Sequence, residues 1–247
     1  DHLEELRRRL LLVVLALGVV AIVAMAFQAQ LKTVIERPLR AAIAMASDEA
    51  VARLRLSRDP DEPVMRLDSL IEGPINAIRL SIYVAITVAF PLLVYQIWAF
   101  VAPGLRREER RAGFLFLPAA VLFFYGGVVL GYAVGLPYLF RLLIQMASAE
   151  HAVLDLRQNF YLSFFGMMTL AFGLVMDIPW LLMVLVRTRV VTPDQVARAR
   201  RFVVLIAAIV AALITPPDPV SQIVMLALIL VLFECGLLAS RLIHRRA

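Results

Sequence analysis

The sequence is poor in the residues that build covalent, metal and nucleotide sites. It contains one cysteine, Cys235, which excludes an intrachain disulfide. Its three histidines, His2, His151 and His244, lack the spacing of metal ligands. There is no glycine-rich loop of the kind that holds phosphates, and no internal repeat. We therefore expect no metal and no cofactor, and we do not expect an enzyme.

Long stretches of the sequence also lack charge. The chain is 62% hydrophobic with a mean hydropathy of +0.86, which is more apolar surface than a soluble core of 247 residues can bury. The apolar runs are unbroken, as in helices that satisfy their own backbone hydrogen bonds, whereas barrel strands alternate in polarity. The sequence predicts an all-α integral membrane protein with a single polytopic domain over 1–247.

Six apolar segments predict six transmembrane helices, with the last two short. The fifth has 13 residues and a length of about 20 Å. Before it, "TPDQ" (192–195) predicts a helix start with a capping box. After it, "TPPDP" (215–219) predicts a stop, with Asp218 and Pro219 starting the next helix. The predicted spans are about 10–30, 78–101, 113–134, 160–186, 202–214 and 220–240.

The arginines predict the topology. Segments 1–9, 102–112, 187–201 and 241–247 carry 15 Arg in 42 residues, whereas the opposite connections carry 9 Lys or Arg in 75. Because basic residues concentrate on the cytoplasmic side, both termini are expected in the cytoplasm. The net charge of +6 then follows from topology and requires no nucleic acid.

The opposite connections, 31–75 and 135–159, are expected to form an extracytoplasmic cap. The apolar stretch that begins at Gly113 is too long for one crossing, and we expect it to turn at "GLPYLF" (135–140). The residues after Pro137 suit a helix that lies along the membrane surface or packs under the cap.

Three acidic residues stand out. Asp177 lies within an apolar run, where a carboxylate costs about 2.5 to 3.5 kcal/mol and so needs a partner, a hydrated cavity or a function. Glu5 and Glu109 lie at the predicted cytoplasmic face among arginines. Hydrogen bonding of Asp177 within the bundle, and pairing of the two glutamates with neighbouring arginines, are the structural alternatives. Glu234 is expected to pair locally or to extend toward the membrane surface.

Five segments of the sequence resemble the signature blocks of the TatC family, the multispanning receptor subunits of the twin-arginine protein translocase. They occur in the family's order and at matching places relative to the six spans, and the similarity covers nearly the whole chain. The segments are "HLEELRRRL" (2–10), "YQIWAFVAPGLRREERR" (95–111), "FGLVMDIP" (172–179), "TPPDPVSQ" (215–222) and "LFECG" (232–236).

The resemblance implies a role for each matching residue. It implies that Glu5 and Glu109 bind the paired arginines of a signal peptide, beside Arg7, Phe100 and Pro103. A second set of positions carries other roles. Asp177 would face a partly hydrated concave side and contact single-span partner subunits, while Pro38 and Asp218 would be structural or extracytoplasmic positions.

The resemblance also implies partners and a location. The expected partners are twin-arginine signal peptides of folded cargo, single-span TatA/TatB-type subunits, membrane lipids and further copies of the chain. The expected location is the bacterial cytoplasmic membrane, with export driven by the proton gradient. Two alternatives come from the residues alone. One is an ion-coupled transporter with Asp177 as the coupling residue, and the other is an intramembrane protease, for which the spans lack a catalytic pair.

Overall fold

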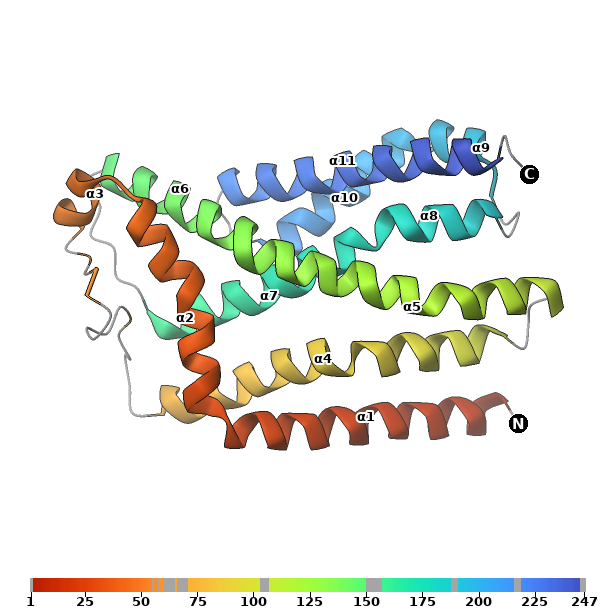
Figure 1. The fold of residues 1–247 in the computed structure, drawn as a ribbon, viewed down its shortest axis with the longest axis horizontal. Helices are drawn as coiled ribbons and strands as arrows, with labels where there is room; N and C mark the ends of the chain where they lie inside the picture. The colour runs from red at the N-terminus through yellow and green to blue at the C-terminus, as the bar shows by residue number, and fades with distance from the viewer. Residues whose placement is uncertain are drawn as a thin grey trace. The chain divides into compact units, whose positions relative to one another are not determined.

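The described part of the chain is built from helices and short connections (Figure 1). The structure, a computed structural model, describes residues 2–54, 56, 58–59, 65, 71–102, 107–149, 157–187, 191–215 and 219–244. The helices are α1 (His2–Ala26), α2 (Gln28–Met45), α3 (Asp48–Arg53), α4 (Glu72–Val101), α5 (Arg107–Leu130), the π-helix η2 (Gly131–Gly135), α6 (Leu136–Ala149), α7 (Gln158–Met176), α8 (Ile178–Arg187), α9 (Pro193–Arg198), α10 (Arg200–Ile214) and α11 (Pro219–His244).

Five helical segments among the described residues are long and apolar enough to cross a membrane. They are Arg7–Ala26, Glu72–Phe100, Leu117–Ala149, Gln158–Arg187 and Pro219–Arg241. The fifth predicted span corresponds to α10, whose 15 residues measure about 22 Å and fall short of a hydrocarbon core of roughly 30 Å. The last span is not short, contrary to the prediction. It lies in α11, whose 26 residues run without interruption past Arg241.

The chain forms two compact units, which are described separately. Unit 1 comprises Asp1–Ala16, Ala89–Val128 and Leu170–Ala247, and unit 2 comprises Leu17–Val88 and Val129–Thr169. The boundaries fall inside α1, α4 and α7 and near the end of α5, so each unit contains parts of these helices.

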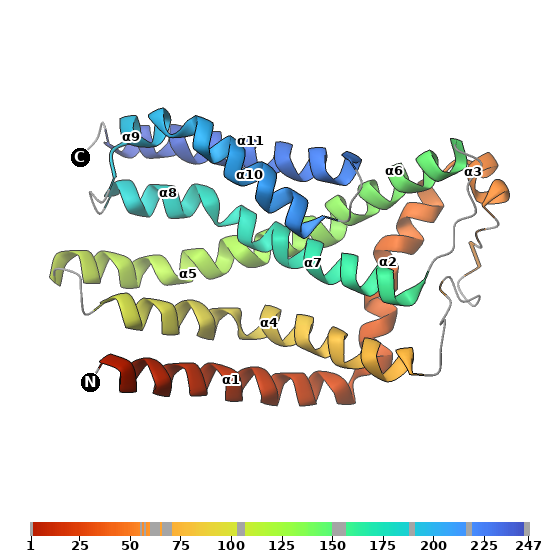
Figure 2. The ribbon, with the colours of Figure 1, turned by 180° about the vertical axis from the view of Figure 1, so that it is seen from behind.

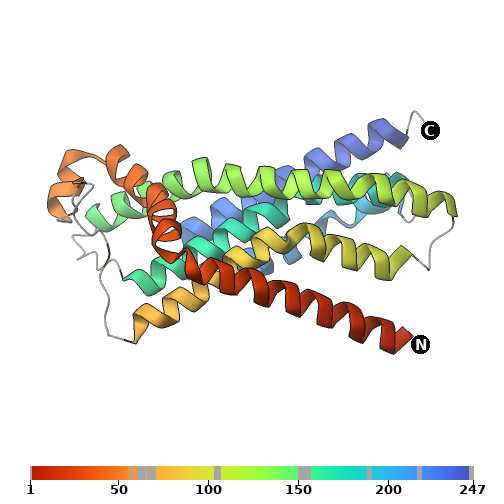
Figure 3. The same ribbon diagram turned by 60° about the horizontal axis from the view of Figure 1, so that its bottom comes forward.

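In unit 2, α2 leaves the end of α1 at a steep angle and packs against α6 (Figure 3). The turn between α1 and α2 is at Phe27. α2 buries one face only, with Ile35, Leu39, Ala42 and Ile43 at helical spacing, and Leu39 is completely buried. On α6 the buried positions are Leu136, Pro137, Leu139, Phe140, Ile144 and Ser148. The first connection therefore contains an amphipathic helix.

Pro38 lies inside α2 and is fully buried. The sequence predicted this proline in the first connection, and that part of the connection is helical. A proline within a helix has no N–H for the carbonyl four residues before it, which here belongs to Val34. The hydroxyl of Tyr132 donates to the Val34 carbonyl oxygen at 2.7 Å. The neighbouring carbonyl of Ile35 accepts from the hydroxyl of Tyr161 at 2.5 Å. Side chains from η2 and α7 thus satisfy the backbone around this proline.

The predicted turn at 135–140 is wrong, because the helix continues from α5 through η2 into α6. At η2 the N–H of Leu136 bonds the carbonyl of Gly131, five residues back. This π turn directly precedes Pro137, whose missing N–H would interrupt a regular α-helix at the same point. The insertion of one π turn therefore lets the helix pass the proline, and α6 then packs against α2.

In unit 1, α8 and α10 both pack against α11 (Figure 2). Gly236 permits the close approach of α11 to α8, since a Cβ there would lie 2.6 Å from the Cα of Pro179. The predicted capping box is present at the start of α9, where the Thr192 side chain accepts from Gln195 N–H and the Gln195 side chain accepts from Thr192 N–H. A turn at Ala199 separates α9 from α10. Pro219 begins α11 as predicted.

Candidate functional site

Unit 1 gathers the ends of several helices at one side. The start of α1, the end of α4, the start of α5, the end of α8, all of α9 and the end of α11 lie at the same end of this unit (Figure 1, Figure 2). These ends adjoin the four arginine-rich segments, which the sequence predicted on one side of the membrane. The structure therefore brings the predicted signal-binding segments to one end of unit 1.

At this end, Glu5 on α1 already binds a guanidinium. Its Oε1 accepts from Arg9 Nε at 3.1 Å and from Arg9 Nη2 at 2.5 Å, one helical turn further along. The Glu5 side chain is 43% exposed and the Arg9 side chain 23%. Pairing with a neighbouring arginine, which was the structural alternative for Glu5, is thus observed in the structure.

Arg9 also connects α1 to α4. Its Nη1 donates to Gln96 Oε1 at 3.3 Å. Gln96 lies one turn before Phe100 on α4, and Phe100 is exposed. Sequence reasoning singled out neither Arg9 nor Gln96. The four-residue spacing from Glu5 to Arg9, which favours ion pairs on a helix, was the signal for Arg9, whereas a contact between α1 and α4 leaves no local signal.

The structure describes the other predicted site residues only in part. Arg7 is exposed on α1. Glu109 belongs to the first turn of α5, and its side chain is outside the described part of the structure. Pro103 and Asp218 lie outside the described residues.

Asp177 interrupts the apolar run of the fourth predicted span. It stands at a turn between α7 and α8, where its N–H bonds the Leu174 carbonyl at 3.2 Å. The cause is Pro179, which cannot donate to the carbonyl of Val175. Asp177 is half-buried, and its Oδ1 is buried without a hydrogen-bond partner among the described residues. That oxygen therefore does not show the hydrogen bonding within the bundle that was the structural alternative.

Glu234 forms a local pair, as predicted. Its Oε2 accepts from Arg200 Nη2 at 2.7 Å, which joins α11 to α10. No group of three or more potential metal ligands exists among the described residues.

A chain with several helices of membrane-spanning length and composition is a multi-pass membrane protein. The chain belongs to the TatC family, because the family model for the Sec-independent protein translocase protein TatC matches residues 1–227.

Curated relatives agree with this assignment. The TatC protein of Halothiobacillus neapolitanus is 34% identical over 246 residues, which cover 99% of this chain and 62% of that protein. The TatC protein of Deinococcus radiodurans is 33% identical over 243 residues, which cover 98% of this chain and 84% of that protein. This chain thus spans less than two thirds of the length of the Halothiobacillus relative.

Solved structures agree as well. A crystal structure described as the twin arginine translocase receptor TatC in DDM matches with a TM-score of 0.80 and 27% identity, and covers 97% of this chain and 99% of that chain. A second crystal structure of a twin arginine translocase receptor TatC has a TM-score of 0.77 and 28% identity, with coverage of 98% and 99%. These matches and the helices of the described residues confirm the prediction of an all-helical membrane protein.

Proposed function

We propose that this chain is the signal-peptide receptor and multispanning core of a twin-arginine translocase. In this proposal the arginine-rich end of unit 1 faces the cytoplasm, and the chain crosses a bacterial cytoplasmic membrane six times, with α10 as the short fifth span. It exports folded proteins with the proton-motive force and together with single-span TatA/TatB-type subunits. The proposal rests on family membership and on the geometry of Glu5.

The observation that carries the receptor proposal is the way Glu5 holds Arg9. One carboxylate oxygen accepts from two nitrogens of a planar guanidinium, a donor geometry that the point charge of a lysine ammonium cannot supply. The pair is partly exposed, so that an arginine of a signal peptide can replace Arg9. Glu109, from the start of α5, is proposed to bind the second arginine, and Arg7, Phe100 and Pro103 complete the patch.

Exposed ion pairs are too weak to account for a receptor alone. Each contributes about 0 to 1 kcal/mol, so an apolar contact must supply much of the affinity. The end of α4 offers one, since Ile97 is 66% exposed and Phe100 is 46% exposed there. We therefore assign the apolar part of the signal peptide to this surface.

The test is a titration of the detergent-solubilised protein with a synthetic twin-arginine signal peptide. Glu5→Gln is expected to weaken binding about fivefold or more, and high salt is expected to weaken binding to the unsubstituted protein. Glu4→Gln is the matched control, because it removes the same charge from the adjacent, exposed position. Equal effects of Glu4→Gln and Glu5→Gln would mean that Glu5 attracts the peptide only through its charge and makes no specific contact with an arginine.

Asp177 is proposed to dock a single-span subunit within the membrane. Its buried oxygen lacks a hydrogen-bond partner in the described residues, and a polar group on a partner helix would supply one. Co-purification of single-span subunits is expected to fall with Asp177→Leu and to survive Asp177→Asn. Unchanged co-purification with Asp177→Leu would contradict this role.

A further inference from the structure

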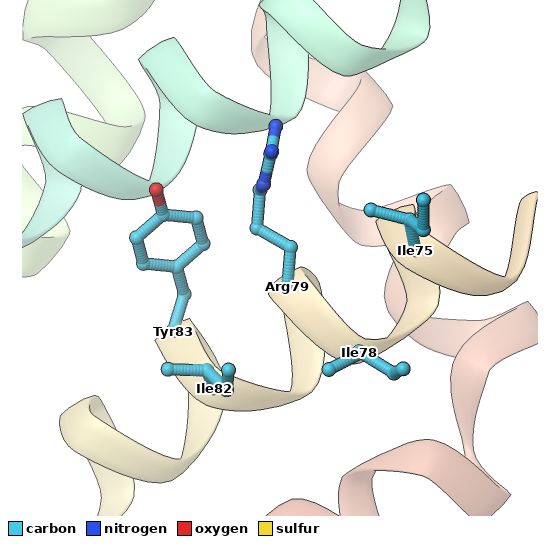
Figure 4. A pocket seen from close by; sticks show the side chains of 5 residues that line it. All are labelled: Ile75, Ile78, Arg79, Ile82 and Tyr83. Carbon is cyan, nitrogen blue, oxygen red and sulfur yellow. The ribbon is translucent and has the colours of Figure 1, made fainter. Parts of the chain in front are cut away.

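A pocket on the side of α4 in unit 2 is not used by the proposed function. It has a volume of about 410 Å³ and is lined by Ile75, Ile78, Arg79, Ile82 and Tyr83 (Figure 4). Successive positions are three or one residues apart, and every second one is four residues apart, so they form one stripe along the helix. The three isoleucines are each about half exposed, at 48%, 49% and 49%. The pocket is therefore an apolar surface with one cation in it.

The cation is held in place by neutral groups. Arg79 Nη1 donates to the carbonyl oxygen of Asn159 at 3.3 Å, and also to Asn159 Oδ1 and Ser163 Oγ, all on α7. Ser163 Oγ itself donates to the Asn159 carbonyl oxygen at 2.8 Å. A guanidinium has five N–H groups, and the hydrogen bonds of Arg79 to described residues all come from Nη1, so those on Nε and Nη2 remain for a ligand. The positive charge of Arg79 is oriented by these contacts but is not neutralised by them.

The depth of Arg79 suits a headgroup contact. The apolar part of α4, Glu72–Phe100, has 29 residues and measures about 43 Å, so a centred hydrocarbon core of roughly 30 Å begins about 7 Å into it. Arg79 lies seven residues, or about 10 Å, from Glu72. Helical side chains tilt toward the N-terminus, and an arginine extends toward the interface, so its guanidinium reaches the level of lipid phosphates.

We propose that this pocket binds one diacyl glycerophospholipid, with its phosphate on Arg79 and an acyl chain along Ile75, Ile78 and Ile82. A phosphate accepts several N–H donors of one guanidinium, which matches the donors left on Nε and Nη2. The ring of Tyr83 forms the deeper wall, because it packs directly on Gly166 of α7. The pocket volume lies within the range of ligand sites, with room for a phosphate and part of one chain.

Native mass spectrometry of the full chain in detergent tests the proposal with three probes. These are dioleoyl phosphatidylglycerol, dioleoylglycerol without phosphate, and glycerol phosphate without chains. Only the first is expected to stay bound, because the site requires both parts. Binding of glycerol phosphate alone to the same site would show a simple anion site and overturn the proposal, as would equal retention of dioleoylglycerol.

Variants locate the binding. Arg79→Gln is expected to reduce retention of phosphatidylglycerol roughly fivefold, the usual effect of one basic residue at a membrane surface. Arg53→Gln is the charge-matched control, because Arg53 is paired with Glu49 on α3 outside the pocket. Ile82→Trp keeps Arg79 and fills the pocket, so it also tests the case in which Arg79→Gln disturbs folding. Ile22→Trp, at an exposed position of α1 that does not line the pocket, controls for the added indole. Unchanged retention with both Arg79→Gln and Ile82→Trp would overturn the site.

A protein partner is the competing occupant, and photocrosslinking in cell membranes distinguishes it. A benzoylphenylalanine at position 78, in place of Ile78, reacts with whatever lies in the pocket. An adduct with the mass of a phospholipid, lost with Arg79→Gln, is expected. An adduct with a protein in place of the lipid would contradict the proposal.

Discussion

The Tyr132 hydroxyl donates a 2.7 Å hydrogen bond to the Val34 carbonyl oxygen, the acceptor whose helical donor Pro38 removes. The bond joins η2 to α2 across 98 residues of sequence. It explains how a fully buried proline is accommodated within a helix of 18 residues. The π turn contributes to this contact because Tyr132 is its second residue.

Removal of this hydroxyl should destabilise the protein. We expect Tyr132→Phe to lower the free energy of unfolding by about 1 kcal/mol, since a carbonyl oxygen loses its donor while the ring remains. Thermal unfolding in detergent measures the change. The matched control is Tyr138→Phe on α6, whose ring is 55% exposed. Equal effects of the two variants would mean that the Val34 contact contributes nothing.

The contact of α8 with α11 depends on Gly236. We expect Gly236→Ala to cost about 1 to 3 kcal/mol, because its Cβ would overlap the Pro179 backbone and the helices would have to separate. Gly126→Ala on α5 is the control. It meets open space and replaces a helical glycine, and it should leave stability unchanged or raise it by up to about 1 kcal/mol. Chemical unfolding curves of both variants decide the matter, and a neutral Gly236→Ala would refute the close packing.

The Arg200–Glu234 pair should contribute little. Both side chains are nearly half exposed, at 49% and 44%, so we expect a coupling of about 0.5 kcal/mol that weakens with added salt. A double-mutant cycle with Arg200→Ala and Glu234→Ala measures it. A coupling above about 2 kcal/mol would show that these two charges are shielded from water.

Arg9 should compete with the arginines of a signal peptide. We expect Arg9→Gln to tighten binding of a twin-arginine peptide up to about fivefold, because the peptide then no longer competes with the Arg9 guanidinium for Glu5. Removal of any positive charge also favours a basic peptide, so Arg8→Gln, an exposed neighbour, is the control. The gain with Arg9→Gln must exceed that with Arg8→Gln. Equal gains would mean that Arg9 does not occupy the binding group.

Local sequence signals predicted the parts of the fold that depend on neighbouring residues. The capping box of Thr192 and Gln195 and the start of α11 at Pro219 follow from side chains within one turn. The continuation through η2 did not follow, because Pro137 reads as a turn unless the preceding π turn is known. The helical setting of Pro38 depends on Tyr132, which is distant in sequence.

In the candidate site, too, the features set by neighbouring residues were predictable and those set by distant residues were not. The residues Glu5 and Asp177 stood out because a charge was unexpected among apolar or basic neighbours. The bond from Arg9 to Gln96 could not be predicted, since it requires the packing of α1 beside α4. The break at Asp177 was foreseeable from Pro179, two residues later, but hydropathy alone reads the segment as one helix.

The central claim is that Glu5 recognises an arginine of the signal peptide as a guanidinium, and a double-mutant cycle across the complex tests it most directly. Peptides with Arg-Arg and with Lys-Lys are each titrated into the unsubstituted protein and into Glu5→Gln, with Glu109→Gln as a parallel cycle. We predict that Arg-Arg binds more tightly than Lys-Lys to the unsubstituted protein, and that either substitution removes most of this preference, a coupling of about 1 kcal/mol or more. The same ratio of Arg-Arg to Lys-Lys affinity in all three proteins would contradict the claim.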